Sequence, residues 1–203
     1  MKIVYWSFSS LPSQTANSVS VMKMASAFDS LGHDVTVIGK KGDSCTEGIE
    51  LFEYYGVKKN FKIIRRTYPE VKLGWIVWGL LMLRIVRRTK PDLVFARDSF
   101  GALLSAMIGF NVFFEVHSPP HGRDKIIYNF LLHLNRVRRI VAISGALQDY
   151  LLKQYSIKEN KIIVAPDAVD QSWLDMSIDK VKSRRQLGYD KGDCVIGYSG
   201  SLY

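Results

Sequence analysis

Short apolar segments alternate with longer segments of helical periodicity along most of this chain, and this alternation limits the possible folds more than any other feature. Several of the apolar segments contain almost no polar residue, among them Ile140-Val141-Ala142-Ile143. Such strands are typical of a parallel sheet that is covered on both faces. The pattern predicts a Rossmann-like α/β domain with a doubly wound, mostly parallel sheet and helices on both faces. The expected strands are residues 2–7, 34–39, 92–97, 111–117, 139–144, 161–166 and 194–199.

The expected helices lie between these strands. The first carries apolar residues at helical spacing from Val21 to Leu31, and Gly32 follows it as a suitable residue for the left-handed conformation after a helix. Residues 48–68 have no clear periodicity and are interpreted as one or two further strands. The expected helices are residues 18–31, 73–89, 99–108, 125–135, 145–155 and 180–187.

The composition excludes several classes of protein. A chain of 203 residues that is 47% hydrophobic can bury a core without disulfides or metals. Two distant cysteines, Cys45 and Cys194, argue against a disulfide framework and a zinc ribbon. The first residues lack the pattern of a signal peptide, so a cytoplasmic location is expected. The net charge of +9 favours anionic partners: nucleic acid, acidic lipid headgroups or phosphorylated substrates.

The domain organisation is interpreted as one domain followed by the beginning of another. Residues 167–179 resemble a linker between a strand and a helix, and an apolar segment that starts at Cys194 resembles a new strand. We therefore expect residues 1–190 to form the first domain and residues 191–203 to contain the first strand of a second. The alternative is that this last strand closes the edge of the first sheet.

Candidate ligand-binding residues follow the strands, because open parallel sheets bind ligands at the carboxyl ends of their strands. Ala16, Asn17 and Ser18 lie where a loop enters a helix whose free N–H groups could hold an anion. The alternative is that Asn17 or Ser18 only caps that helix. The chain contains neither G-x-G-x-x-G nor a P-loop motif, which disfavours dinucleotide oxidoreductases and P-loop NTPases.

Three further strand ends carry polar residues. Arg97 could bind a phosphate, or it could pair with Asp98 or another carboxylate, and the pairing is favoured. His117 ends a strand before a loop stiffened by prolines, where a structural role and a ligand contact are equally expected. Ser144 precedes a helix, and capping is favoured over a ligand role for its hydroxyl.

The helix expected at residues 73–89 allows two interpretations. Its apolar run covers 11 residues, fewer than the roughly 20 that span a bilayer. Trp75 and Trp78 near one end and arginines at the other suit a helix lying on anionic lipid. The favoured alternative is a helix packed on the sheet, with the arginines stabilised by the helix dipole at its C-terminal end. No nucleic-acid-binding motif accompanies the basic residues, so no nucleic-acid partner is expected.

Five segments together carry a family resemblance. Phe114-Glu115-Val116-His117 resembles an "E-x-H" strand end, and Val141-Ala142-Ile143-Ser144 with Ala146-Leu147 resembles a "V-A-I-S-x-A-L" segment. With residues 16–35, 161–170 and 196–203, they resemble the N-terminal half of family-4 glycosyltransferases, the retaining enzymes of the GT-B fold. The chain departs from that pattern where Asp167-Ala168 replaces Asn-Gly and where the first loop lacks paired glycines.

The resemblance implies an acceptor-side domain of an enzyme that moves a sugar from a nucleotide-diphosphate donor to a glycan or lipid-linked acceptor, as in polysaccharide biosynthesis. It implies that His117 hydrogen-bonds the donor sugar or developing charge. It places Ala16, Asn17, Ser18, Arg97, Asp98 and Ser144 near the substrates, and no metal or other cofactor is expected. The protein would be cytoplasmic, with a peripheral position on the inner face of the plasma membrane as one option.

In this family, the groups that hold the donor diphosphate belong to the C-terminal domain. The expectation is therefore that these 203 residues alone have little or no transferase activity. One alternative is a non-catalytic subunit that binds membrane and acceptor in a split glycosyltransferase. A second is another Rossmann-like enzyme, such as an epimerase, which the missing glycine fingerprint disfavours.

Overall fold

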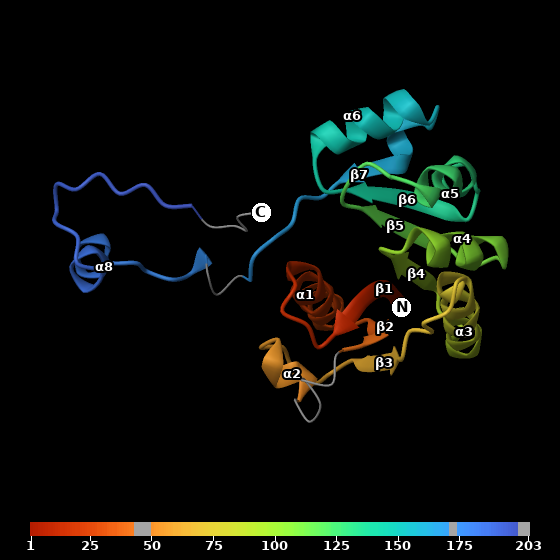
Figure 1. Ribbon diagram of the computed structural model, residues 1–203, viewed down its shortest axis with the longest axis horizontal. Helices are drawn as coiled ribbons and strands as arrows, with labels where there is room; N and C mark the ends of the chain where they lie inside the picture. The colour runs from red at the N-terminus through yellow and green to blue at the C-terminus, as the bar shows by residue number, and fades with distance from the viewer. Residues whose placement is uncertain (43–49, 171–173, 199–203) are drawn as a thin grey trace. The chain divides into compact units, whose positions relative to one another are not determined.

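The computed structural model describes residues 1–42, 50–170 and 174–198. The chain divides into two compact units, Met1–Asp167 and Ala168–Tyr203. The first unit contains the whole sheet and every helix from α1 to α6, whereas the described part of the second contains the short helix α8 (Figure 1).

The first unit is built on a seven-stranded sheet in which every strand pair is parallel. The spatial order is β3-β2-β1-β4-β5-β6-β7, so the chain winds to one side of β1 and then returns to build the other side from β4. Ligand sites of open sheets lie at such a reversal. The strands are β1 (Lys2–Leu11), β2 (Asp34–Lys41), β3 (Lys62–Arg66), β4 (Leu93–Ala96), β5 (Val112–Val116), β6 (Val137–Ala142) and β7 (Ile162–Val164).

Helices cover the sheet on both faces (Figure 1). Val4 and Trp6 of β1 face one buried cluster together with α3, α4, α5 and α6, whereas Ile3 and Tyr5 face a second cluster together with α1 and α2. This alternation explains why β1 is apolar at successive positions. The helices are α1 (Ala16–Ser30), α2 (Leu51–Tyr54), α3 (Gly74–Thr89), α4 (Ser99–Met107), α5 (Arg123–Leu131), α6 (Gly145–Gln154) and α8 (Lys180–Gln186), with the 3-10 turn η2 (Glu159–Lys161).

The doubly wound α/β fold predicted from the sequence is confirmed, and so is a further strand within residues 48–68: the described residues 50–68 form the strand β3 after the short helix α2. One local expectation is wrong. The strand expected at residues 194–199 is not formed over its described part, 194–198. A strand needs a neighbour to pair its backbone N–H and C=O groups, and the described residues of the second unit contain no other strand. Ser199 lies outside the described residues.

The caps of two helices bear on the capping roles that the sequence analysis considered. Neither Asn17 nor Ser18 caps α1: the N-cap is Thr15, whose Oγ1 accepts a hydrogen bond from the Ser18 N–H at 3.4 Å. Ser144 does cap α6, with its Oγ accepting from the Leu147 N–H at 3.2 Å. Gly32 has φ of +82°, which confirms its role in ending α1.

Helix α3 packs on the sheet through one face, as favoured from the sequence. Trp78, Met82 and Val86 are at most 1% exposed on that face. Its other face keeps Val77, Leu80 and Leu81 exposed by 41–51%. Among the described helices, none is both long enough and apolar enough to span a membrane.

Candidate functional site

A cavity of about 540 Å³ opens at the carboxyl ends of β1, β4 and β5, beside the reversal in strand order. Five of the residues predicted from the sequence line it together: Ala16, Asn17, Arg97, Asp98 and His117. They come from the start of α1 and from the ends of β4 and β5, so parallel strand order brings them to one place. The lining also includes Ser7, Phe8, Ser20, Ser99, Glu115, Ser118, Arg123, Asp124, Tyr128 and Asp167.

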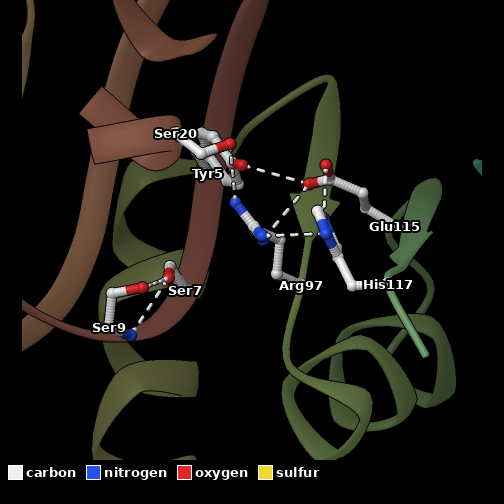
Figure 2. A network of polar contacts seen from close by, with 7 residues as sticks. All are labelled: Tyr5, Ser7, Ser9, Ser20, Arg97, Glu115 and His117. Atoms are coloured by element: carbon white, nitrogen blue, oxygen red, sulfur yellow. Dashed lines mark hydrogen bonds and ion pairs between the residues drawn. The ribbon is translucent and has the colours of Figure 1, made fainter. Parts of the chain in front are cut away.

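Arg97 is the centre of a hydrogen-bonded network in this cavity (Figure 2). Its Nη1 donates to Ser20 Oγ at 3.1 Å, and its Nη2 donates to His117 Nδ1 at 3.2 Å. Its Nε lies 3.6 Å from Glu115 Oε2. The side chains of Arg97 and Glu115 are only 10% and 4% exposed, so each charge is stabilised chiefly by the other. The favoured pairing of Arg97 with a carboxylate is thus observed, but with Glu115 rather than with Asp98.

The hydrogen-bond partners of His117 indicate one tautomer of its imidazole ring. Its Nε2 lies 2.8 Å from Glu115 Oε1, and a carboxylate can only accept, so Nε2 carries the proton. A guanidinium can only donate, so Nδ1 is the unprotonated acceptor from Arg97. Both ring nitrogens are therefore engaged by the protein. A ligand that hydrogen-bonds the imidazole must replace the contact with Arg97 or with Glu115.

Tyr5 supports the network from within the core. Its hydroxyl donates to Glu115 Oε2 at 3.1 Å, and its ring packs edge-on against Phe95 at a centroid distance of 5.1 Å. Burial, and then the charge of Glu115, raises the pKa of Tyr5 well above its usual value. Tyr5 therefore remains a neutral donor that fixes the carboxylate of Glu115.

Asp98 and Asp124 form a second polar group at the start of α4 and α5. Asp98 caps α4, with its Oδ2 accepting from the Gly101 N–H at 2.7 Å. Burial, with a smaller contribution from the nearby Asp124, raises the pKa of Asp98 to about 6. Asp124 accepts a hydrogen bond from Ser99 Oγ at 2.7 Å. Both carboxylates keep further lone pairs for a ligand.

The charge of the lining is unbalanced toward acid. It contains four carboxylates, Asp98, Glu115, Asp124 and Asp167, against two guanidinium groups, Arg97 and Arg123. Carboxylates accept hydrogen bonds from hydroxyl groups and repel phosphates. The cavity is thus better suited to a ligand rich in hydroxyls than to a free polyanion.

Ser18 and Ser144 do not line this cavity. Ser18 is fully buried, and its hydroxyl donates to the carbonyls of Ser13 and Thr15 at 2.7 and 2.8 Å. The hydroxyl of Ser144 caps α6. Their expected contacts with substrate stay predictions, since the observed hydrogen bonds of both are structural.

Several lining residues were not among the site residues predicted from the sequence. Glu115 is part of the E-x-H strand end, and an acidic residue inside the apolar strand β5 is itself a signal that a partner must lie nearby. Asp124 and Tyr128 lie on α5, and Asp167 follows β7. Only the strand order brings these three to the cavity.

Glu115, His117 and Asp167 offer potential metal-ligating atoms that lie within 4.8 Å of one another. Glu115 and His117 are already hydrogen-bonded to each other, and the guanidinium of Arg97 lies beside both. A divalent cation would have to displace that positive charge, so this donor set fits a metal ion poorly.

Comparisons with solved structures show the same fold at low sequence identity. A glycosyltransferase from Rickettsia africae ESF-5 superposes with a TM-score of 0.63 at 18% identity, covering 94% of this chain and 50% of that one. HepE of Anabaena, solved with UDP and glucose, superposes with a TM-score of 0.60 at 18% identity, covering 93% of this chain and 50% of that one. A UDP-GlcNAc 2-epimerase from Methanocaldococcus jannaschii superposes with a TM-score of 0.61 at 15% identity, covering 81% of this chain and 45% of that one.

The chain thus spans about half the length of these proteins. Because they include both a transferase and an epimerase, the fold alone does not separate the two activities. Among curated proteins, none gives a significant match. The model of Glycosyltransferase Family 4 matches residues 18–173, which include most of α1, the strands from β2 to β7 and most residues of the cavity. On that match over more than half of its length, the chain belongs to Glycosyltransferase Family 4.

Proposed function

We propose that this chain is the acceptor-side half of a glycosyltransferase that moves a sugar from a nucleotide-sugar donor to a glycan or lipid-linked acceptor. The observation that carries the proposal is the acid-rich cavity at the carboxyl edge of the sheet, which contains four carboxylates and two arginines. A sugar presents many hydroxyl donors and no charge, and this lining matches such a ligand.

Asp98 and Asp124 are the groups we assign to the acceptor hydroxyls. Asp98 accepts a hydrogen bond from the Gly101 N–H and Asp124 accepts one from Ser99 Oγ, and a carboxylate has about four acceptor sites, so both keep acceptor capacity. Asn17, Arg97 and His117 are assigned to the other wall, where the transferred sugar would lie. Catalysis would then be positioning and electrostatic stabilisation by a fixed polar network.

The donor's diphosphate is assigned to a different domain. The family resemblance implies that the groups that hold it belong to a C-terminal domain, and the acid-rich lining here, which is unfavourable for a diphosphate, supports this proposal. We propose, as expected from the sequence, that residues 1–190 act as the acceptor-side domain and that residues 191–203 lead into the donor-binding one. The 203 residues alone are expected to show little or no sugar transfer, and robust turnover by them would contradict this assignment.

Binding of neutral sugars by the wild-type chain tests the proposal. Saturation-transfer NMR with disaccharides of glucose, galactose, mannose and N-acetylglucosamine should detect at least one ligand. The double variant Asp98→Asn and Asp124→Asn keeps the shape of both side chains. It should bind that ligand with an affinity about tenfold lower than that of the wild-type chain. Ser156→Ala, outside this cavity, serves as the control. Absence of any signal, or equal signals in both proteins, would contradict the proposal.

A lipid-linked acceptor is favoured by one further observation on α3. Val77, Leu80 and Leu81 form an exposed apolar strip, and Arg84 and Arg88 continue the same face of the helix. Near its start, the ring of Trp75 lies 4.6 Å from the guanidinium carbon of Arg123, a residue of the cavity lining. An apolar strip with flanking cations suits an anionic membrane surface. We therefore propose a peripheral position on the cytoplasmic face of a membrane, with α3 at the lipid.

Vesicle flotation tests this membrane contact. The wild-type chain should float with vesicles that contain anionic phosphatidylglycerol, whereas Leu80→Gln with Leu81→Gln should not. Trp78 is unsuitable for this test because it is 1% exposed and belongs to the core. Met107→Gln with Ile108→Gln removes two exposed apolar side chains from the end of α4 and is the matched control. Equal flotation of all three proteins would reject the contact and leave a soluble glycan as the acceptor.

A further inference from the structure

A second cavity, of about 500 Å³, lies at the opposite edge of the sheet from the proposed acceptor site. It is formed where α5 leads into β6 and where η2 leads into β7, so it borders the amino ends of these two strands. We call it the amino-edge cavity. Nothing in the proposed sugar transfer uses it.

Its charge is the reverse of that of the acceptor cavity. Arg138, Arg139, Lys158 and Lys161 line it, together with His133, and its lining contains no carboxylate. Within the described part of the chain, none of these four cations forms an ion pair with an acidic side chain. Four uncompensated like charges around one concave surface repel one another, and an anion bound between them removes that repulsion.

Two of these cations, Lys161 and Arg138, are also held in place by the protein. Lys161 Nζ donates to the carbonyl oxygens of Leu132 and Leu134, at 2.6 and 3.2 Å, which leaves its third N–H for another acceptor. Arg138 Nε donates to Asn111 Oδ1 at 2.9 Å, which leaves its terminal N–H groups unused. Burial lowers the pKa of Lys161, and a bound anion would oppose that effect. The site is therefore partly preorganised, which reduces the entropy lost on binding.

We propose that the amino-edge cavity is a binding site for a phosphate-bearing anion that carries at least two negative charges. Arginine and lysine are the side chains that recognise phosphate oxygens. The same chemistry is offered by a soluble diphosphate and by a phosphorylated lipid headgroup. A single-stranded nucleic acid is disfavoured, because the lining has no Phe, Tyr or Trp on which bases could stack.

Calorimetric titration of the full chain with inorganic pyrophosphate tests the site, at constant ionic strength set with sodium chloride. The double variant Arg138→Gln and Lys158→Gln removes two cations whose side chains are exposed, and it keeps Lys161, which ties α5 to η2. Lys182→Gln with Arg185→Gln removes the same charge from exposed positions on α8 and is the matched control. Thermal unfolding of all three proteins shows whether each is folded.

Wild type and control should bind pyrophosphate alike, and the amino-edge variant should bind it about tenfold more weakly. A second arm uses vesicles with and without phosphatidic acid. Binding to phosphatidic acid alone, lost in the same variant, supports the site with a lipid headgroup as its ligand. The proposal is overturned if neither probe binds, or if both variants lose binding equally, because the effect is then only that of net charge. This outcome is independent of the sugar-binding test, because Asp98 and Asp124, the residues replaced in that test's binding-site variant, line the cavity at the other edge of the sheet.

Discussion

Arg97 and His117 lie 3.2 Å apart, and the guanidinium donates to the Nδ1 atom of the imidazole (Figure 2). In this contact the ring accepts through Nδ1, while Glu115 holds its other nitrogen. Arg97 is thus a positioning residue for His117, and it is also the cation paired with the buried Glu115.

Replacing Arg97 by alanine should be strongly destabilising. The carboxylate of Glu115 would then remain buried with no cation, which costs about 3–5 kcal/mol in such pairs. The double variant Arg97→Ala and Glu115→Gln removes that charge and should recover part of the loss. The free energy of unfolding in urea, measured for both single variants and the double variant, gives the coupling. Additive losses would show that the two side chains do not depend on each other.

Asp98 should make stability depend on pH in the acidic range. Its pKa is about 6 in the folded chain, against about 3.9 for an unfolded aspartate. Between these values the folded state holds a proton that the unfolded state has released, so the free energy of unfolding falls as pH rises from about 4 to 6. The total fall from this group is at most about 3 kcal/mol.

Asp98→Asn tests this dependence, because asparagine can still cap α4 and cannot ionise. The difference in unfolding free energy between variant and wild type should shift in favour of the variant on going from pH 4 to pH 7. Urea unfolding at pH 4, 5, 6 and 7 measures it. A constant difference across this range would show that Asp98 titrates normally.

Gly101 should tolerate no side chain. A Cβ atom on it would lie 2.6 Å from Cδ2 of the Trp6 indole, and Trp6 is fully buried and cannot move away. Gly101→Ala should cost about 3 kcal/mol, at the upper end of overpacking effects. It should also disturb the α4 cap, because the Gly101 N–H is the donor to Asp98.

Gly145→Ala is the matched control for this substitution. Gly145 starts α6, and a Cβ atom there would meet nothing within 4 Å. Alanine should be neutral or stabilising by up to about 0.5 kcal/mol, since glycine loses more backbone entropy on folding. Thermal unfolding compares the two variants, and similar losses in both would contradict the packing argument.

The fold could be predicted from the sequence because its strands are short, apolar and separated by helices with clear periodicity. The secondary structure of residues 50–68 was harder to predict, since a four-residue helix such as α2 is too short to show a helical period. At residues 194–198, by contrast, the sequence pattern predicts a strand that the structure does not form. This segment has the composition of a strand, but pairing requires a neighbour that the sequence pattern cannot supply.

The candidate site could be predicted only in part. Arg97, Asp98 and His117 were found because they follow strands, and the carboxyl ends of parallel strands share one edge. The ion pair between Arg97 and Glu115 depends on β4 lying beside β5, and the Tyr5 hydrogen bond depends on which face of β1 carries that side chain. Asp167 also follows an expected strand, at residues 161–166, but only the strand order shows that this strand end lies at the same cavity.

A map of backbone amide shifts, recorded during titration with the disaccharide that binds best, locates the sugar on the protein. If the sugar binds in the acceptor cavity, the perturbed amides belong to Asn17, Asp98, His117 and Asp124, at the carboxyl edge of the sheet. Perturbations confined to the amino-edge cavity or to α8, with none at these four residues, would contradict binding in the acceptor cavity.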